Sequence, residues 1–219
     1  MNSYWDNFKD IHRYGTCLVI GNGLSLNHIP KKLLRKYFSF GTNRIFLMKD
    51  FVPTYYVAVN ALKIVQNQEE IQNICAKKKF IEFPLNLLFP QSIPIHSILP
   101  FPSKNPGHGI CQGSTVTNVC LQIAYWMGFS TVLLIGIDHR YNTVGIANEI
   151  MTKDPKAMDH FYFDRIEENV PWQYPDLKNS ELYYGLVKTM YEKDSRTIIN
   201  ITPNSALDIF EKQKYRDWI

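Results

Sequence analysis

The stretch Cys17-Leu-Val-Ile-Gly-Asn-Gly-Leu-Ser-Leu26 decides the fold. Its apolar half is typical of a buried parallel strand, and Gly21 and Gly23 let the backbone turn sharply and come close to a ligand. Nucleotide-binding α/β folds carry such a turn at the carboxyl end of the first strand, where backbone N–H groups face a phosphate. A third glycine is missing and no Gly-Lys-Ser/Thr follows, so neither the dinucleotide fingerprint nor the P-loop is present. An ordinary turn between two core elements is an equal alternative.

Strand-like and helix-like patterns alternate outward from this stretch. Apolar runs predict strands at 17–20, 40–43, 55–59, 79–83, 131–135 and 197–201. Helical spacing and end signals predict helices at 31–37, 61–75, 115–127, 180–193 and 206–212. Because alternating strands and helices form right-handed crossovers, we predict one Rossmann-like α/β domain over residues 1–219. Its sheet is expected to be mostly parallel and flanked by helices.

Two long segments interrupt this alternation. Residues 84–113 hold six prolines, and residues 142–176 are polar and aromatic. Segments of this length inside a compact domain are uncommon unless they carry function. We therefore expect both on the substrate side of the domain, with residues 142–176 as a lid. A mobile surface loop is the alternative for each.

Composition narrows the class of protein. A net charge of +4 over 219 residues fits an anionic small substrate or weak attraction to an acidic membrane surface, and it is too diffuse for nucleic acid. The four cysteines form no C-x-x-C pair, so they indicate buried thiols in a reducing compartment and not disulfides or zinc ligands. No apolar leader or membrane-length apolar run is present, so we expect a cytoplasmic protein, with a place at the inner membrane as an alternative.

Polar residues follow the predicted strands at matching places. Asn22, Asn43 and Asn60 come after the first three strands. Further polar groups stand at 113–115, 136–141 and 202–205. Carboxyl ends of parallel strands share one crevice, so these groups are expected to meet there. Asparagines suit hydroxyls, base edges and phosphate oxygens, and hydroxyls at a helix start make an anion cradle. Single residues among them also fit plain helix caps.

Taken together, these motifs resemble the bacterial lipooligosaccharide sialyltransferases, which are Rossmann-like enzymes using CMP-activated sialic acid. The chain is also similar to a broader family that includes flagellin-glycosylating motility accessory factors and archaeal 6-hydroxymethylpterin diphosphokinases. The resemblance runs in order along nearly the whole chain. Its motifs are Gly-Asn-Gly-x-Ser-Leu at 21–26, Gly-Ile-Asp at 136–138, Asp-His-Phe at 159–161 and Pro-Asn-Ser at 203–205.

The resemblance implies a set of site residues. Nucleotide contacts are implied for Gly21, Asn22, Gly23, Ser25, Asn43, Asn60, Gly113, Ser114, Thr115, Asp138, Tyr141 and Asn204. Arg140 stands near the place where those enzymes carry phosphate-binding tyrosines, so it is expected to take the phosphate as a fixed cation. Their catalytic histidine lies in the following loop. Here the base is His160 or Asp164, because an ungapped match puts Asp164 at that point.

These residues suit a sugar transferase. An inverting transfer needs a base for the acceptor hydroxyl and donors for the leaving phosphate. No Asp-x-Asp pair occurs in the chain, which favours a monophosphate-sugar donor with no metal cofactor, although Mg²⁺ stays open. We therefore expect transfer of a sugar, a nonulosonic acid, from a CMP-sugar to a glycan, lipid-linked saccharide or protein hydroxyl. A homo-oligomer stays open. The alternatives are an ATP-dependent 6-hydroxymethylpterin diphosphokinase-like enzyme and a non-catalytic nucleotide-binding module of polysaccharide assembly.

Overall fold

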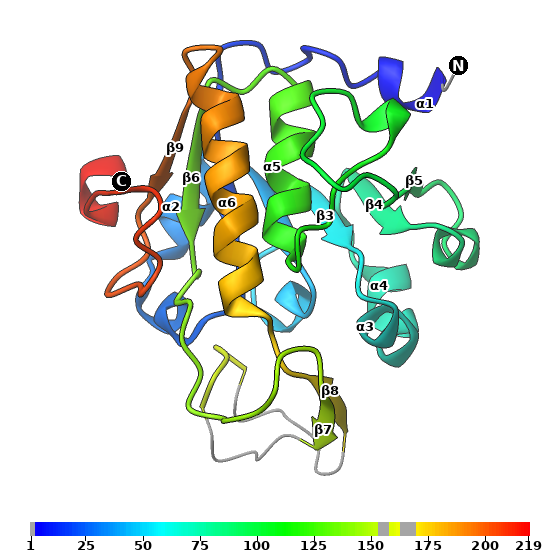
Figure 1. Ribbon diagram of the computed structural model, residues 1–219, viewed down its shortest axis with the longest axis vertical. Helices are drawn as coiled ribbons and strands as arrows, with labels where there is room; N and C mark the ends of the chain where they lie inside the picture. The colour runs from blue at the N-terminus through cyan, green and yellow to red at the C-terminus, as the bar shows by residue number, and fades with distance from the viewer. Residues whose placement is uncertain (1–2, 153–157, 163–169) are drawn as a thin grey trace.

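An eight-stranded sheet forms the centre of the protein in the computed structural model, which describes residues 3–152, 158–162 and 170–219. All neighbouring strands of this sheet are parallel, in the order β10-β9-β6-β1-β2-β3-β4-β5. The strands are β1 (Thr16–Ile20), β2 (Phe38–Thr42), β3 (Tyr55–Ala58), β4 (Lys78–Glu82), β5 (Ile93–Ile95), β6 (Thr131–Ile135), β9 (Thr197–Asn200) and β10 (Glu211–Lys212). The expected mostly parallel α/β sheet flanked by helices is confirmed (Figure 1).

Helices cover both faces of this sheet. The helices are α1 (Ser3–Asp6), α2 (Lys31–Lys36), α3 (Ala61–Gln66), α4 (Gln68–Asn73), α5 (Val116–Trp126) and α6 (Leu177–Glu192). In β1, Cys17 and Val19 enter the core cluster that contains residues of α5 and α6. Leu18 and Ile20 enter the second cluster, with residues of α2, α3 and α4. Successive strand residues point to opposite faces, so a fully apolar run is what a sheet covered on both sides requires.

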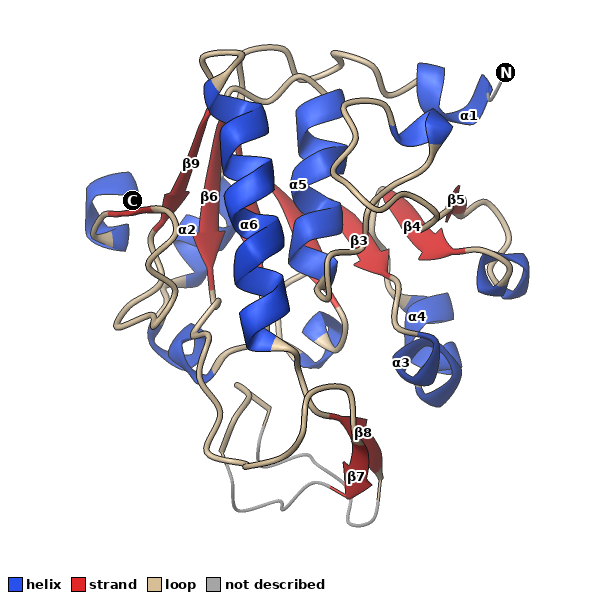
Figure 2. Cartoon of the chain, viewed as in Figure 1, coloured by secondary structure: helices blue, strands red, loops and turns tan. Residues whose placement is uncertain are grey.

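The order of the strands fixes where a ligand site lies. From β1 the chain builds outward through β2, β3, β4 and β5, and then returns to place β6, β9 and β10 on the other side of β1. The strand order therefore reverses between β1 and β6, and open α/β sheets bind ligands outside the carboxyl ends of the strands at such a point. Both long helices, α5 and α6, begin at this same edge (Figure 2).

Two of the predicted helices differ from the structure. Residues 206–212 form turns and the short strand β10, so the helix expected there is wrong. The Asn200 amide donates to Ser205 Oγ and to the Leu207 carbonyl, which holds the chain in a tight turn after β9. The helix expected at 61–75 is divided at Asn67, whose side-chain amide donates to the Lys63 carbonyl at 2.6 Å. A side chain that takes a helix carbonyl competes with the backbone and ends the helix.

The two long segments contain short strands that the sequence pattern does not predict. In the proline-rich segment, Ile93 and Ile95 are buried and flank Pro94 in β5, an edge strand, which is where a sheet tolerates proline. The segment expected as a lid holds an antiparallel pair, β7 (Ile150–Thr152) and β8 (Pro171–Gln173), which lies beyond the carboxyl ends of the main sheet (Figure 1). Among the helices of the described ranges, none has the length and apolar character that a membrane span requires.

Candidate functional site

The loops that follow β1 and β6 pack directly against each other. A Cβ atom added at Gly21 would overlap the Gly136 carbonyl, and one added at Gly23 would overlap the Asp138 carboxylate. The backbones are joined as well, because Gly21 N–H donates to Ile135 O and Gly23 N–H donates to Gly136 O, both at 2.9 Å. Both glycines therefore provide space between two loops, which is a reason for glycine independent of any ligand.

Asp138 and Ser25 hold this junction together. The Asp138 carboxylate accepts a hydrogen bond from the Ser25 backbone N–H at 3.0 Å and another from the Ser25 hydroxyl. Their polar atoms therefore brace the turn after β1, and Ser25 lines neither of the cavities described below. Ser25 therefore has a supporting place beside the site, whereas Asp138 both braces this turn and lines the first of those cavities.

We expect Asp138→Ala to lower the free energy of unfolding by about 2 kcal/mol, because two hydrogen bonds to a charged acceptor disappear. Urea unfolding measures the change. Asp138→Asn keeps one acceptor oxygen, so its loss is expected to be smaller. Equal stability of the Ala variant and the parent protein would contradict this role.

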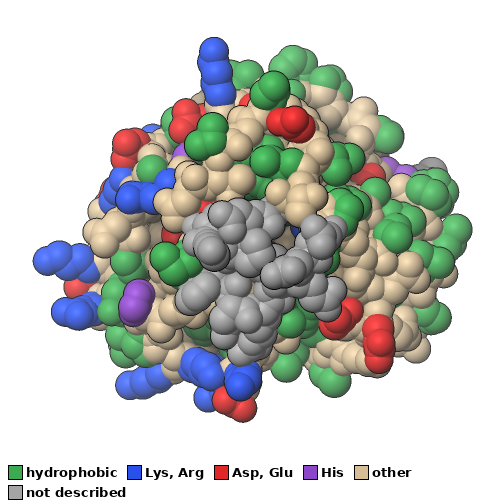
Figure 3. Space-filling view, turned by 90° about the horizontal axis from the view of Figure 1, so that it is seen from below, with side chains coloured by type: hydrophobic (Ala, Val, Ile, Leu, Met, Phe, Trp, Pro, Cys, Tyr) green, Lys and Arg blue, Asp and Glu red, His purple; other side chains and the backbone are tan. Residues whose placement is uncertain are grey.

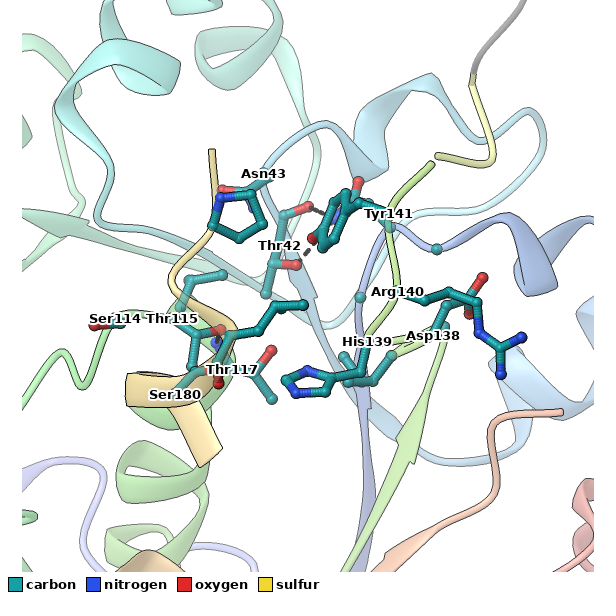
Figure 4. Close-up of a pocket in the computed structure, with 18 of the residues that line it drawn as sticks. Thr42, Asn43, Ser114, Thr115, Thr117, Asp138, His139, Arg140, Tyr141 and Ser180 are labelled. Atoms are coloured by element: carbon teal, nitrogen blue, oxygen red, sulfur yellow. Dashed lines mark hydrogen bonds between the residues drawn. The ribbon is translucent and has the colours of Figure 1, made fainter. Parts of the chain in front are cut away.

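Two adjoining cavities open at the reversal of the strand order. The first, of about 130 Å³, lies under both glycine loops and the beginnings of α5 and α6 (Figure 4). The second, of about 220 Å³, lies beside it and reaches toward β8. Together they reach the size of small-molecule sites. They share lining residues, namely Asn43, Ser114, Thr115, Val116, Tyr141, His160, Pro175 and Asp176.

Most of the predicted nucleotide residues gather around these cavities. Those that line the first are Gly21, Asn22, Gly23, Asn43, Ser114, Thr115, Asp138 and Tyr141. Asn60 lines the second. Gly113 lines neither, and its positive φ of 56° and the close approach of Asn118 and Tyr183 explain a glycine there.

The N-termini of α5 and α6 converge on the first cavity. Thr115 caps α5, its hydroxyl accepting from Thr117 N–H at 3.3 Å, and Asp176 caps α6, its carboxylate accepting from Asn179 N–H at 3.0 Å. The Asn179 amide also donates to the Ser114 hydroxyl at 2.5 Å, which ties the two helix starts together. Helix N-termini carry partial positive charge and unpaired N–H groups, so the start of α5 favours an anion, whereas the start of α6 is already capped by the Asp176 carboxylate.

Two asparagine residues that line this cavity each have a buried side-chain oxygen without a hydrogen-bond partner in the described part of the chain. The Asn22 amide nitrogen donates to Thr42 O at 2.9 Å and to Thr42 Oγ1 at 3.1 Å. Its Oδ1 is buried, as is Oδ1 of Asn43, and neither has a hydrogen-bond partner within the described part of the chain. Because a carbonyl can only accept, the Asn22 orientation is fixed and its remaining atom is an acceptor. That atom suits a ligand hydroxyl or amine and does not suit a phosphate oxygen.

Asn60 is occupied by structural contacts. Its Oδ1 accepts from Lys63 N–H at 3.1 Å as the cap of α3, and its amide donates to Gln173 Oε1 at 2.8 Å. The second bond reaches from the end of β3 to β8. Asn60 thus holds β8 at the cavity, and the sequence could not show this because its partner is 113 residues away.

Arg140 and Asn204 lie away from the place expected for them. The Arg140 guanidinium donates to the main-chain carbonyl of Asn204 and points away from the hydroxyls of the first cavity (Figure 4). Asn204 lines neither of the two cavities; it lines another one beside the C-terminal segment. Arg140 is therefore at the rim of the site, turned toward the loop after β9.

His139, the residue before Arg140, is a candidate functional residue that the sequence did not indicate. Its side chain is 6% exposed, lines the first cavity and lies 2.9 Å from Glu181 Oε1 through Nε2. Its chain neighbour Asp138 binds Ser25. No sequence signal joins His139 to Glu181, since they are 42 residues apart and meet only when α6 packs beside the site.

Aromatic side chains line the second cavity. His160 lies 6.0 Å from the Tyr141 ring, 5.0 Å from the Tyr162 ring and 6.4 Å from the Trp172 ring, measured between centroids. Burial raises the pKa of Tyr141 and of Tyr162 above the ordinary value of tyrosine, so both hydroxyls stay protonated even in alkaline solution. The backbone N–H of Phe161 donates to the Asn22 carbonyl at 3.0 Å, which fixes this segment over the turn after β1.

One candidate base cannot be placed, because Asp164 lies outside the described residues. No group of three His, Cys, Asp or Glu side chains that could hold a metal ion occurs within residues 3–152, 158–162 and 170–219. A scan against protein-family models finds none that matches this chain, and a search of curated proteins finds no match. The family resemblance therefore stays a prediction.

Proposed function

We propose that the protein is a glycosyltransferase of the sialyltransferase-like class. It would transfer a sugar, a nonulosonic acid, from a CMP-sugar to a hydroxyl of a glycan, a lipid-linked saccharide or a protein, with inversion and without a metal ion. The observation that supports this most is the N-terminus of α5 in one cavity with Asn22 and Asn43, whose side-chain oxygens have no partner within the described residues, at the carboxyl ends of β1 and β2. An anionic group with hydroxyls close to it satisfies both features.

The first cavity suits the nucleotide. Beside the start of α5 the hydroxyls of Thr115 and Thr117 line it, and in this proposal they bind one phosphate, whereas the Ser180 hydroxyl already donates to the Leu177 carbonyl. Oδ1 of Asn22 accepts from a ribose hydroxyl or a base amine in this arrangement. Arg140 is turned to Asn204 in the structure, so in this proposal neutral donors stabilise most of the leaving phosphate.

The second cavity suits the transferred sugar and its acceptor. Aromatic rings bind the apolar faces of sugars, and Tyr141, Trp172 and Tyr174 stand together there. His160 lines both cavities, so it lies where the sugar and the acceptor hydroxyl would meet. The imidazole of a neutral histidine can take a proton from that hydroxyl.

Thermal shift with CMP, CDP, UDP and ATP, each with and without Mg²⁺, tests the proposal. CMP at about 100 times its dissociation constant is expected to stabilise the native state by about 2.7 kcal/mol, with or without Mg²⁺. Stabilisation by ATP and Mg²⁺ alone would contradict the proposal and favour the diphosphokinase. Binding of CMP without hydrolysis or transfer of any CMP-sugar tested would favour the non-catalytic module.

Replacement of Asn43 tests the nucleotide site. Asn43 has a positive φ of 48°, so Asn43→Gly removes the amide without backbone strain. We expect the dissociation constant for CMP, measured by calorimetry, to rise about tenfold, the cost of one hydrogen bond to a buried ligand. Asn204→Gly is the matched control, because Asn204 has a φ of 53° and lines neither of the two cavities. Equal affinity of both variants would remove Asn43 from the site.

A further inference from the structure

Basic side chains gather on one side of the molecule, outside both cavities. Helix α2 contributes four cations and no acid, and the C-terminal segment contributes three more cations. These seven residues, which we call the basic face, are Lys31, Lys32, Arg35, Lys36, Lys212, Lys214 and Arg216. Figure 3 shows Lys and Arg side chains along the left and lower edges of the face at the carboxyl ends of the strands.

The two parts of the basic face are in direct contact. Lys36 Nζ donates to the Trp218 carbonyl at 3.0 Å, and the Tyr37 hydroxyl donates to the same oxygen at 3.2 Å. Acidic neighbours compensate part of the charge, because Asp50 pairs with Lys31 and Asp208 with Lys212. Glu211 and Asp217 are exposed in the same C-terminal segment, so the seven cations exceed these four carboxylates by three. In the described part of the chain, Lys32, Lys214 and Arg216 belong to no ion pair.

Aromatic residues and a cavity lie next to the cations of the basic face. Tyr37, Tyr215 and Trp218 are half-buried among them, and tyrosine and tryptophan are the residues that favour the boundary between water and lipid. A cavity of about 550 Å³ is lined by Lys212, Lys214 and Arg216 and by no acidic side chain. This hollow can receive an anionic headgroup, while the cations of α2 lie outside it and can contact neighbouring headgroups.

We propose that the basic face docks on a bilayer of anionic phospholipid. Each Lys or Arg near such a surface contributes about 1 kcal/mol, so a few uncompensated cations give reversible attachment. A free phosphate ester would need only the hollow, whereas the cations of α2 lie outside it, next to the C-terminal segment that Lys36 contacts. The attachment does not depend on the proposed transferase activity, and its test uses no substrate.

Sedimentation of the full chain with lipid vesicles tests the inference. We expect binding to vesicles that contain about one third phosphatidylglycerol, no binding to pure phosphatidylcholine vesicles, and release as the salt concentration rises. Equal binding to both kinds of vesicle would overturn an electrostatic docking surface. Absence of binding to the anionic vesicles at low salt would overturn it as well.

Two double variants of equal net charge test which surface of the protein binds the vesicles. Lys214→Glu with Arg216→Glu changes the basic face, and Lys77→Glu with Lys78→Glu changes the exposed opposite edge, where β4 begins. Each replacement exchanges a positive charge for a negative one and lowers the net charge by two. Both double variants therefore have a formal net charge of zero instead of +4. We expect the first to weaken vesicle binding about tenfold or more and the second to have little effect. Equal losses would assign the binding to net charge and overturn the assigned face.

A soluble headgroup distinguishes a membrane from a free ligand. Glycerol phosphate at low millimolar concentration is expected neither to raise the melting temperature of the full chain nor to displace it from anionic vesicles. Stabilisation that is lost in the Lys214→Glu, Arg216→Glu variant, together with no vesicle binding, would make the hollow a site for a free phosphate ester. That result would overturn the membrane inference.

Discussion

Replacing Gly21 by alanine is expected to lower the free energy of unfolding by about 3 kcal/mol. The added Cβ would overlap the carbonyl oxygen and the carbonyl carbon of Gly136, which are backbone atoms at the end of the central strand β6. A side chain could rotate away, but this carbonyl can move only if the strand moves. Overpacking of a fixed structure costs about 1–3 kcal/mol, and the upper end applies here. Urea unfolding followed by circular dichroism measures the change.

Gly185→Ala is the matched control for this variant. Gly185 lies within α6, and no atom outside its own helix and chain neighbours lies within 4 Å of an added Cβ. Alanine is favoured over glycine inside a helix by about 1 kcal/mol, so this variant is expected to be more stable than the parent protein. If both alanine variants had the same stability, the contact between the loops after β1 and β6 would not be a determinant of the fold.

Replacing His160 by alanine is expected to lower the turnover number by 10²- to 10⁴-fold, the usual contribution of a general base. The dissociation constant for CMP is expected to rise much less, because His160 lines the first cavity only where it meets the second and lies among the aromatic rings of the second. Single-turnover kinetics with a CMP-sugar donor and calorimetry with CMP measure the two quantities separately. His28→Ala is the control, since His28 is exposed and lines neither of the two cavities.

Two further variants identify the base if His160 is not essential. His139 also lines the first cavity and is held by Glu181, so it is chemically able to transfer protons. Loss of turnover in His139→Ala, with activity retained in His160→Ala, would transfer the role to His139. Loss confined to Asp164→Ala would support the other residue that the family resemblance implies.

The sheet could be predicted from the sequence because burial on both faces leaves a plain pattern. The run at 17–20 has Leu18 and Ile20 on one side and Cys17 and Val19 on the other, and only a sheet covered by helices on both sides needs this. The edge strand β5 could not be predicted, because three residues with a central proline give too short a pattern. The turns at 201–210 depend on the Asn200 amide, which carries no periodic signal.

The location of the candidate site could also be predicted, since parallel strands bring their carboxyl ends together whatever the loops contain. The hydrogen-bond partners of each polar group could not be predicted. Ser25, Asn60 and Ser114 are matched to partners 113, 113 and 65 residues away, and these pairings exist only in the folded chain. The sequence therefore identifies polar residues near a ligand without showing which of their atoms are still available.

The packing of Trp172 gives the protein an optical probe of its own. This indole is 6% exposed and its ring lies 5.8 Å from that of Tyr141, at the wall of the second cavity. The other tryptophans, Trp5, Trp126 and Trp218, line neither of the two cavities. With phenylalanine at those three positions, the emission of a single fluorophore would follow the filling of the cavity in solution, without a label and without turnover.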